Sequence, residues 1–219
     1  MNRPAPTESV LLRGPDGAIE ALIDAPEKVR GIALVCHPHP LFGGANTNKI
    51  THTLARSLRE LGYAAVRPNF RGVGKSEGEH DHGGAETEDM LSVLAWAQSR
   101  WGVLPIALAG FSFGAFVQTR IAQRLAGGVT PAERIVLVGT ATGDVRGARH
   151  YTTETVPKDT LVIHGAEDDN VPLANVLDWA RPQELPVVVV PGADHFFHGK
   201  LHLIRDIIAR AWAPRETHR

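Results

Sequence analysis

The sequence predicts an α/β protein whose central sheet is mostly parallel. Short apolar runs alternate with amphipathic helical patterns from Gly31 onward, and the runs carry almost no polar residues. Strands that are apolar on both faces are typical of parallel sheets covered by helices on both sides. Strict alternation of strand and helix favours parallel pairing through right-handed crossovers. We expect one domain over residues 1–219, with residues 1–7 and 214–219 fraying.

The elements can be assigned in chain order. Two strand-like runs between Leu11 and Ile23 flank Gly14-Pro15-Asp16-Gly17, which predicts an N-terminal antiparallel hairpin. Apolar runs predict the later strands at Ile32–Cys36, Tyr63–Arg67, Ile106–Ala109, Arg134–Val138, Thr160–His164 and Val187–Val190. Apolar residues at helical spacing predict helices after Gly44, over Glu86–Trp101, after Ser112 and over Leu201–Trp212.

The pentapeptide Gly110-Phe111-Ser112-Phe113-Gly114 fits the pattern G-x-S-x-G between a predicted strand and a predicted helix. At such an elbow the serine is forced onto a sharp turn, and its hydroxyl stands clear of the sheet edge. The flanking glycines have no Cβ, so strand and helix can approach closely. A glycine-rich turn with a passive serine is the alternative, but the strand–turn–helix context favours a nucleophile at Ser112.

A serine nucleophile needs a base that takes its proton and an acid that orients the base. In an open parallel sheet these groups gather beyond the carboxyl ends of the strands. Glu167, Asp168 and Asp169 follow the strand at Thr160–His164, and His195 follows the last predicted strand. Only one of the three adjacent carboxylates can face the base, and the chain order serine, acid, histidine is the one expected with this elbow. We interpret the neighbouring Asp194 as a cap of the last helix.

With these residues the sequence resembles the α/β-hydrolase superfamily, and most of all its small lidless bacterial serine hydrolases of the dienelactone-hydrolase-like and serine-aminopeptidase-like kinds. The resemblance extends from about Ile32 to Trp212. Residues 164–172 match the family pattern H-G-x-x-D-x-x-V-P, which implies that Asp168 is the acid. Residues 192–195 match G-x-x-H, which implies that His195 is the base. The resemblance implies a single-domain α/β-hydrolase fold.

The tetrahedral intermediate of acyl transfer needs backbone N–H donors for its oxyanion. One donor should come from Phe113, which follows the nucleophile, and the other from the loop after the first parallel strand. Pro38 and Pro40 in that loop have no N–H. In relatives the donor lies two residues after the histidine, which points to His39. Leu41 is the alternative, because two prolines can shift the register.

The segment 139–159 is too short for a helical cap, which would need at least two helices of ordinary length. We therefore predict that there is no cap domain and that the mouth of the site is open. We expect residues 39–42, 80–84 and 151–155 to form its rim. An open site cannot bury much of a long acyl chain, so small or water-soluble substrates are favoured.

Composition excludes several other classes. The chain has 23 basic and 24 acidic residues and no basic stripe, so we expect no nucleic-acid partner. No apolar run has membrane-spanning length, and the first residues lack the apolar core of a signal peptide. The single cysteine, Cys36, fits a reducing compartment, so a cytoplasmic location without membrane association is expected.

Two groups of histidines raise the question of a metal site: His37, His39, His80 and His82, and then His195, His198 and His202. Paired histidines need a further ligand at a defined distance, and neither H-E-x-x-H nor C-x-x-C occurs. We therefore expect no metal and no cofactor.

The sequence thus predicts a serine hydrolase that acts by acyl transfer on a small ester-like molecule. A carboxylesterase is the favoured activity. A peptidase or a thioesterase could use the same residues, and a non-catalytic binding protein could retain the same fold. The sequence carries no signal for an oligomeric state.

Overall fold

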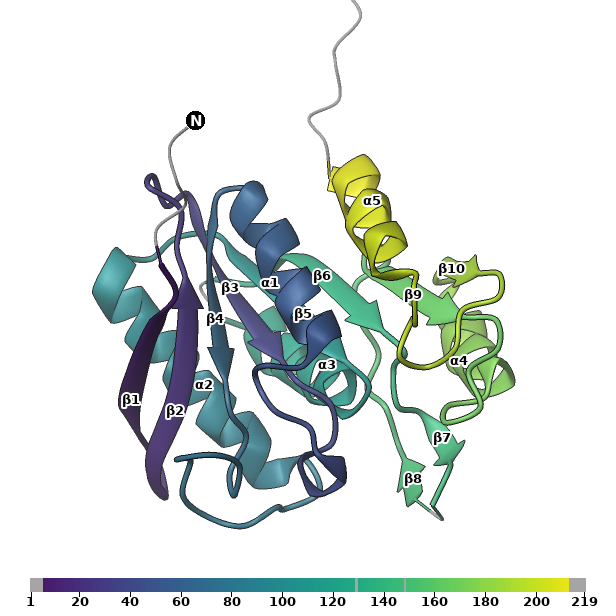
Figure 1. Cartoon of the computed structure of the whole chain (residues 1–219), viewed down its shortest axis with the longest axis horizontal. Coiled ribbons are helices and arrows are strands. Elements are labelled where there is room, and N and C mark those ends of the chain that lie inside the picture. Colours follow the sequence, from purple (N-terminus) through teal and green to yellow (C-terminus); the bar gives the residue numbers. More distant parts are fainter. Residues whose placement is uncertain (1–5, 129, 148, 213–219) are drawn as a thin grey trace, which may run out of the picture.

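An eight-stranded sheet is the centre of the computed structural model, which describes residues 6–128, 130–147 and 149–212. Its strand order is β1-β2-β4-β3-β5-β6-β9-β10 (Figure 1). The strands are β1 Glu8–Gly14, β2 Gly17–Asp24, β3 Gly31–Cys36, β4 Tyr63–Pro68, β5 Ile106–Phe111, β6 Ala132–Val138, β9 Leu161–Gly165 and β10 Val187–Val190. Strand β2 pairs antiparallel with β1 and with β4, and all later neighbours in the sheet are parallel. The predicted mostly parallel sheet with an N-terminal hairpin is confirmed.

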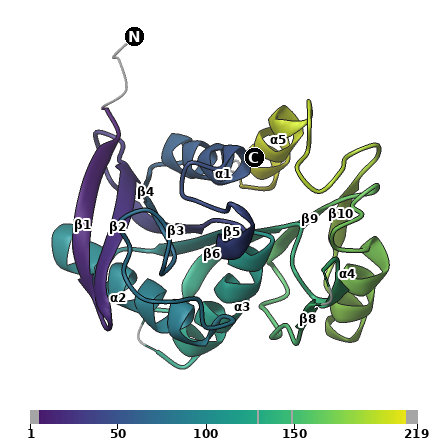
Figure 2. The ribbon, with the colours of Figure 1, turned by 60° about the horizontal axis from the view of Figure 1, so that its bottom comes forward.

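Helices cover both faces of this sheet. Helices α1 and α5 lie on one face, and α2, α3 and α4 lie on the other (Figure 2). Their bounds are α1 Lys49–Glu60, α2 Gly84–Trp101, α3 Phe113–Ala126, α4 Leu173–Ala180 and α5 Leu201–Trp212. The central strands alternate between the two resulting cores: Ile32, Leu34 and Cys36 of β3 face the α2–α3 side, while Ala33 and Val35 face α1. Burial on both faces explains why these strands have nearly continuous apolar sequences.

Helix α4 and a small hairpin were not predicted from the sequence. Helix α4 buries only Val176 and Ala180, so its apolar stripe is too short to stand out as a helical pattern. Within residues 139–159, the three-residue strands β7 (Gly143–Val145) and β8 (Arg149–Tyr151) form a small antiparallel hairpin. This hairpin is the only regular structure in the described part of that segment. The segment therefore carries no helical cap, as predicted.

The two chain ends that we expected to fray lie mostly outside the described residues. At the beginning of the described chain, the Thr7 hydroxyl donates a hydrogen bond to Asp24 at 2.6 Å. Among the described helices, none combines the length and the apolar character that crossing a bilayer requires.

The turn from β5 into α3 brings three backbone segments unusually close together. Ser112 occupies this turn with φ 56° and ψ −118°, a conformation that costs energy for any residue with a side chain. A Cβ on Gly110 would lie 2.5 Å from the Gly114 backbone. A Cβ on Gly114 would collide with the carbonyl oxygens of Cys36 and His37 at the end of β3. Glycine is therefore required on both sides of Ser112 so that β3, β5 and α3 can meet.

Gly114→Ala should lower the free energy of unfolding by about 1–3 kcal/mol, because the added methyl group must displace backbone that cannot move freely. Gly127→Ala at the other end of α3 is the matched control, because a Cβ there meets no atom within 4 Å. The control should stay within about 0.5 kcal/mol of the unsubstituted protein. Urea unfolding of the two variants measures the difference, and equal stabilities would contradict the proposed close contact.

Candidate active site

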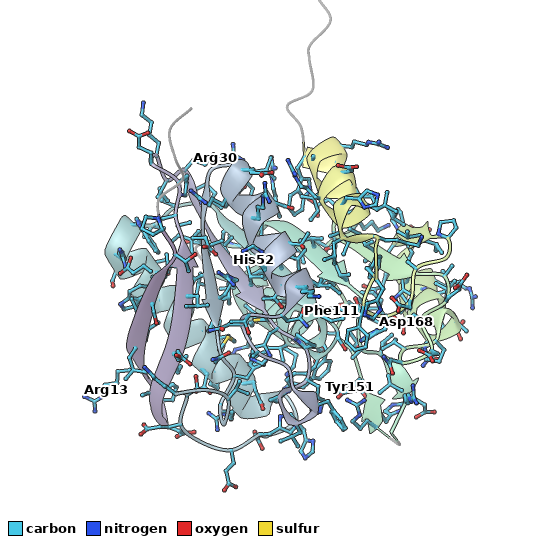
Figure 3. All side chains as sticks on the ribbon, viewed as in Figure 1. Arg13, Arg30, His52, Phe111, Tyr151 and Asp168 are labelled. Carbon is cyan, nitrogen blue, oxygen red and sulfur yellow. The ribbon has the colours of Figure 1, made fainter. Side chains whose placement is uncertain are left out.

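Three loops at the carboxyl ends of the parallel strands bring Ser112, Asp168 and His195 together. Asp168 lies at this end of the sheet, whereas Arg30, before β3, lies at the opposite end (Figure 3). The Nε2 atom of His195 is 3.1 Å from the Ser112 Oγ, and its Nδ1 atom is 2.7 Å from Asp168 Oδ2. The Asp168 carboxylate accepts a hydrogen bond from the Nδ1–H group, so the proton of the neutral ring is on Nδ1 and Nε2 is left as the acceptor for the serine hydroxyl. The structure thus brings together the three residues that the sequence analysis named, with His195 between Ser112 and Asp168.

The local turn after β9 decides which of the adjacent carboxylates reaches the histidine. Asp168 Oδ1 accepts hydrogen bonds from the N–H groups of Asn170, at 3.0 Å, and Val171, at 2.8 Å. The other oxygen is then held toward His195, and the Asp168 side chain is fully buried. Glu167 and Asp169 are exposed to solvent. The turn therefore directs one carboxylate inward and its neighbours outward.

His164 supports the same carboxylate from behind, a contact that the sequence analysis did not identify. Its Nε2 atom donates to the carbonyl of Val171 at 3.0 Å and lies 3.5 Å from Asp168 Oδ2. Burial lowers the pKa of His164, which favours the neutral ring. The sequence shows a histidine directly before Gly165, but the direction in which the His164 ring points depends on the fold.

His195 lies in a loop rather than on a helix. Its ring packs 4.9 Å from the Phe111 ring and 5.1 Å from the Phe196 ring, centroid to centroid. Asp194 does not cap the last helix, which begins at Leu201. It accepts instead a hydrogen bond from the His198 N–H at 3.0 Å, and so closes the turn that precedes the helix.

Two backbone N–H groups have no described acceptor of their own: that of Phe113, the residue after Ser112, and that of His39, which lines the same cavity as Ser112. No described acceptor takes a hydrogen bond from the N–H of Phe113 or from that of His39. The N–H of Leu41, the alternative donor, is engaged with His39 Nδ1 at 3.2 Å. Phe113 is also the first residue of α3, where the helix dipole favours negative charge. The geometry therefore favours Phe113 and His39 over Leu41 as donors to an oxyanion.

His37 fixes the direction of the His39 N–H. The His37 ring is fully buried, and its Nε2 accepts a hydrogen bond from the Phe70 N–H at 2.9 Å. The proton is then on Nδ1, which donates to the Pro38 carbonyl at 2.6 Å. The Pro38 carbonyl and the His39 N–H belong to one planar peptide group and point in opposite directions. Holding the carbonyl inward therefore holds the N–H outward, toward the site.

Both histidines of this loop are neutral. Burial lowers the pKa of His37 to about 4. Burial also lowers the pKa of His39 to about 3, with the nearby His80 and Arg149 contributing in the same direction. A neutral ring at His39 can accept the Leu41 N–H at Nδ1, which a protonated ring could not do.

Of the four histidines considered first for a metal site, His80 and His82 pack behind His39. The rings of His39 and His80 are 4.6 Å apart, and those of His80 and His82 are 4.9 Å apart. His80 Nδ1 pairs with the fully buried Glu86 at 2.6 Å. Among the described residues, no three histidine, cysteine or carboxylate side chains are arranged as a metal site would require.

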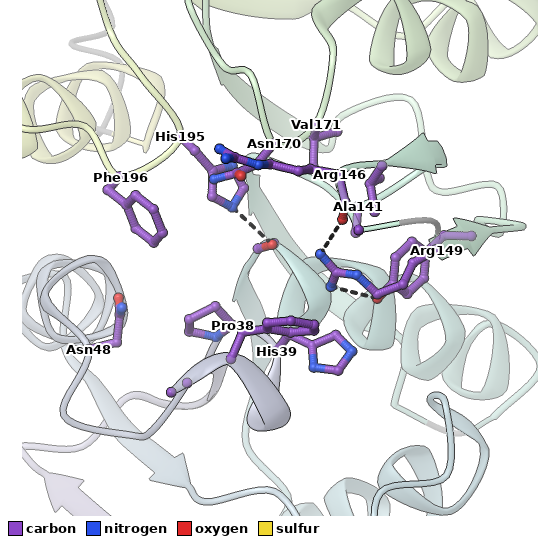
Figure 4. A pocket seen from close by; sticks show the side chains of 17 residues that line it. Pro38, His39, Asn48, Ala141, Arg146, Arg149, Asn170, Val171, His195 and Phe196 are labelled. Carbon is purple, nitrogen blue, oxygen red and sulfur yellow. Dashed lines mark hydrogen bonds between the residues drawn. The ribbon is translucent and has the colours of Figure 1, made fainter.

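A cavity of about 360 Å³ opens above Ser112. Its walls include His39 and Phe42 from the loop after β3, Phe196 from the loop after β10, and Arg149 and Tyr151 from β8 (Figure 4). Of the predicted rim, residues 40, 41 and 152–155 lie outside the lining, whereas His39, Phe42 and Tyr151 do line the cavity. The predicted rim at 80–84 does not, because the Glu86 carboxylate binds the N–H groups of Asp81, at 3.0 Å, and Gly83, at 2.9 Å, and holds this segment behind His39.

His37→Leu should lower kcat by about 10²–10³-fold, the usual effect of losing one oxyanion donor, because the Pro38–His39 peptide would no longer be held. His202→Leu, an exposed substitution on α5, is the control and should leave kcat unchanged. Thermal unfolding must accompany the kinetics, because His37 is buried. A folded His37→Leu variant with unchanged kcat would contradict this role.

Comparisons with known proteins agree with the fold. Residues 19–133 match the family described as X-Pro dipeptidyl-peptidase (S15 family). A lidless α/β serine hydrolase from Xanthomonas campestris is 34% identical, with a TM-score of 0.83 over 96% of each chain. An α/β serine hydrolase homologue from Coxiella burnetii is 38% identical, with a TM-score of 0.82 over 94% of this chain and 97% of that one. The lysophosphatidylserine lipase ABHD12 of Gallus gallus is 32% identical over 62% of this chain and 40% of its own length. The chain therefore belongs to the α/β-hydrolase superfamily, among the small serine hydrolases that have no lid.

Proposed function

We propose that this serine hydrolase is a carboxylesterase that acts by acyl transfer on small ester-like molecules. The observation that carries the proposal is one continuous chain of hydrogen bonds, from the Ser112 hydroxyl to His195 and on to Asp168. Two backbone donors without acceptors stand beside it, at Phe113 and His39. Nucleophile, base, orienting acid and oxyanion donors are the parts that acyl transfer requires.

In the proposed reaction the Ser112 oxygen attacks the ester carbonyl while its proton passes to His195 Nε2. The carbonyl oxygen becomes an oxyanion that accepts hydrogen bonds from the Phe113 and His39 N–H groups. Collapse of this intermediate breaks the ester C–O bond, and the imidazolium returns the proton to the leaving alcohol. A water molecule then repeats the sequence on the acyl-enzyme and releases the acid and free Ser112.

Asp168 acts through His195 rather than on the substrate. Its carboxylate keeps the imidazole in the tautomer that leaves Nε2 free to accept the serine proton. It also stabilises the imidazolium that forms during the attack. Its Oδ1 atom accepts the N–H groups of Asn170 and Val171, and these two hydrogen bonds keep the carboxylate from turning away from His195.

A peptidase is the second candidate, because residues 19–133 match a peptidase family. Esters and amides pass through the same tetrahedral intermediate, so these residues could serve either reaction. Comparing kcat/KM for 4-nitrophenyl butyrate with that for aminoacyl-proline 4-nitroanilides separates the two. A preference for the nitroanilides would replace the esterase proposal. A protein that only binds would turn over neither.

No cofactor takes part in the proposed mechanism, because side chains and backbone supply every group. A cytoplasmic location remains our proposal, supported by the single cysteine, Cys36, which is buried and unpaired.

Ser112→Ala should abolish labelling by a fluorophosphonate and reduce ester turnover by about 10⁶-fold, because it removes the nucleophile itself. Ser76, whose hydroxyl donates to the Asn69 carbonyl, offers a control in Ser76→Ala, which should still be labelled. Mass spectrometry of the labelled peptides identifies the modified serine. Labelling at any other serine, or turnover that survives in Ser112→Ala, would refute the assignment.

Asp168→Asn should reduce kcat by about 10⁴-fold, because the imidazole can then adopt the wrong tautomer. Glu167→Gln and Asp169→Asn, at its two exposed neighbours, should each stay within about tenfold of the unsubstituted enzyme. Steady-state kinetics on one ester, with circular dichroism as a check on folding, compares the three. An inactive Asp169→Asn together with an active Asp168→Asn would mean that the acid is misassigned.

A further inference from the structure

The β7–β8 hairpin directs an arginine into the cavity above Ser112. Figure 4 shows the Arg149 guanidinium reaching from β8 into the pocket, below Ala141 and above His39. Its Cζ atom lies 4.3 Å from the centroid of the Phe42 ring, so the cation stacks on an aromatic face. Nη2 donates to the Arg146 carbonyl at 2.7 Å, and Nη1 donates to the Tyr151 hydroxyl at 3.4 Å. The guanidinium is held in one orientation, yet each terminal nitrogen has a second N–H to offer.

The charge of Arg149 is not neutralised by the described part of the chain, in which no carboxylate oxygen lies within 4.0 Å of its nitrogens. The acidic groups around the site are already engaged: Asp168 with His195, Glu86 with His80, and Asp144 with His150. The Nε atom of Arg149 is shielded from solvent and has no hydrogen-bond partner among the described residues. A half-buried cation without a counter-charge is costly unless an anion binds there.

A second cation stands at the mouth of the same pocket. Arg146 also lines the cavity, and its closest acidic contact is the exposed Asp169 at 3.7 Å. Solvent weakens an ion pair that is this long and this exposed. Most of the positive charge of Arg146 therefore remains available to a bound anion. The two arginines, both carried by the β7–β8 hairpin, give one side of the cavity a positive potential.

We propose that Arg149, assisted by Arg146, binds a carboxylate group of the substrate, so that the preferred esters are those that carry a free carboxylate. The inference rests on the proposed esterase function and names the substrate class of that site. A planar guanidinium stacked on Phe42 presents parallel N–H groups, the geometry that pairs with both oxygens of a carboxylate.

Tyr151 completes this subsite. Burial raises the pKa of Tyr151, so its hydroxyl keeps its proton and can donate to an anion while it accepts from Arg149. The cavity, at about 360 Å³, is large enough for a small ester with one further charged group. Two other wall residues, Phe42 and Phe196, are apolar and suit the carbon chain between the ester and the carboxylate.

The test uses ester pairs that differ only in charge. In one pair the acyl part is adipate, as the mono-4-nitrophenyl ester or as its methyl-capped diester. In the other the leaving group is varied, as 3-acetoxybenzoate or its methyl ester. The variants are Arg149→Gln, which removes the charge, and Arg149→Lys, which keeps the charge but not the planar fork. Arg13→Gln, an exposed substitution on β1 remote from the site, is the control (Figure 3).

The unsubstituted enzyme should prefer the charged member of at least one pair. In Arg149→Gln, kcat/KM for that ester should fall by about 10- to 100-fold, the usual value of hydrogen bonds to a charged group. The neutral member should change less than about threefold, and Arg149→Lys should lie between. Arg13→Gln should match the unsubstituted enzyme on both. Equal losses on both members, or no preference for charge, would overturn the proposal.

A binding measurement separates this proposal from the esterase assignment. Calorimetry on Ser112→Ala, which cannot turn over the ester, should detect the mono-4-nitrophenyl adipate and not its methyl-capped partner. The added substitution Arg149→Gln should remove that binding. If the enzyme hydrolyses neutral esters but Ser112→Ala does not distinguish the pair, the carboxylate site fails and the esterase stands. If charge-dependent binding occurs without hydrolysis of any ester, the esterase fails and the carboxylate site stands.

Discussion

The close approach of three backbones at Ser112 is the constraint on which the rest of the site depends. Gly114, in the first turn of α3, rests directly on the carbonyls of Cys36 and His37 at the end of β3. The same contact therefore positions Ser112, the proposed nucleophile, together with the Phe113 N–H and the beginning of the loop that carries the His39 N–H. Gln118, one turn further along α3, strengthens it by donating to the carbonyls of Leu34, at 2.8 Å, and Ala109, at 2.9 Å. A side chain on α3 thus joins the two central strands that lead into the site.

Two polar side chains near Ser112 are each held in one orientation, because all of their hydrogen-bonding atoms already have partners. Asp168 has both oxygens engaged, and His37 has both ring nitrogens engaged. Each group can then adopt one orientation, because any rotation would leave a buried donor or acceptor without a partner. This arrangement positions the proposed catalytic groups before any substrate is present, which is the main way in which a protein site lowers a barrier electrostatically.

Sequence patterns predicted the strands and most helices because the two cores impose a regular apolar periodicity on them. They also pointed to Ser112 and His195, which occur in short motifs after predicted strands, and the resemblance to a known family singled out Asp168 among three adjacent carboxylates. They did not find α4, whose buried face is two residues long, or the β7–β8 hairpin, whose strands have three residues each. The role of His37 and the position of Arg149 depend on the path of loops. No periodicity encodes that path, so these features became visible only in three dimensions.

The neutral rings of His37 and His39, in the loop after β3, have a consequence for the stability of the whole fold. An unfolded histidine takes up a proton below about pH 6.5. In the folded chain, His37 does so only near pH 4 and His39 only near pH 3. Between these limits the unfolded chain binds more protons than the folded one, so the free energy of unfolding declines as the medium is acidified. The loop that keeps its rings uncharged for hydrogen bonding thereby makes the protein less stable in acid, through proton linkage at two imidazole rings that the proposed reaction does not use.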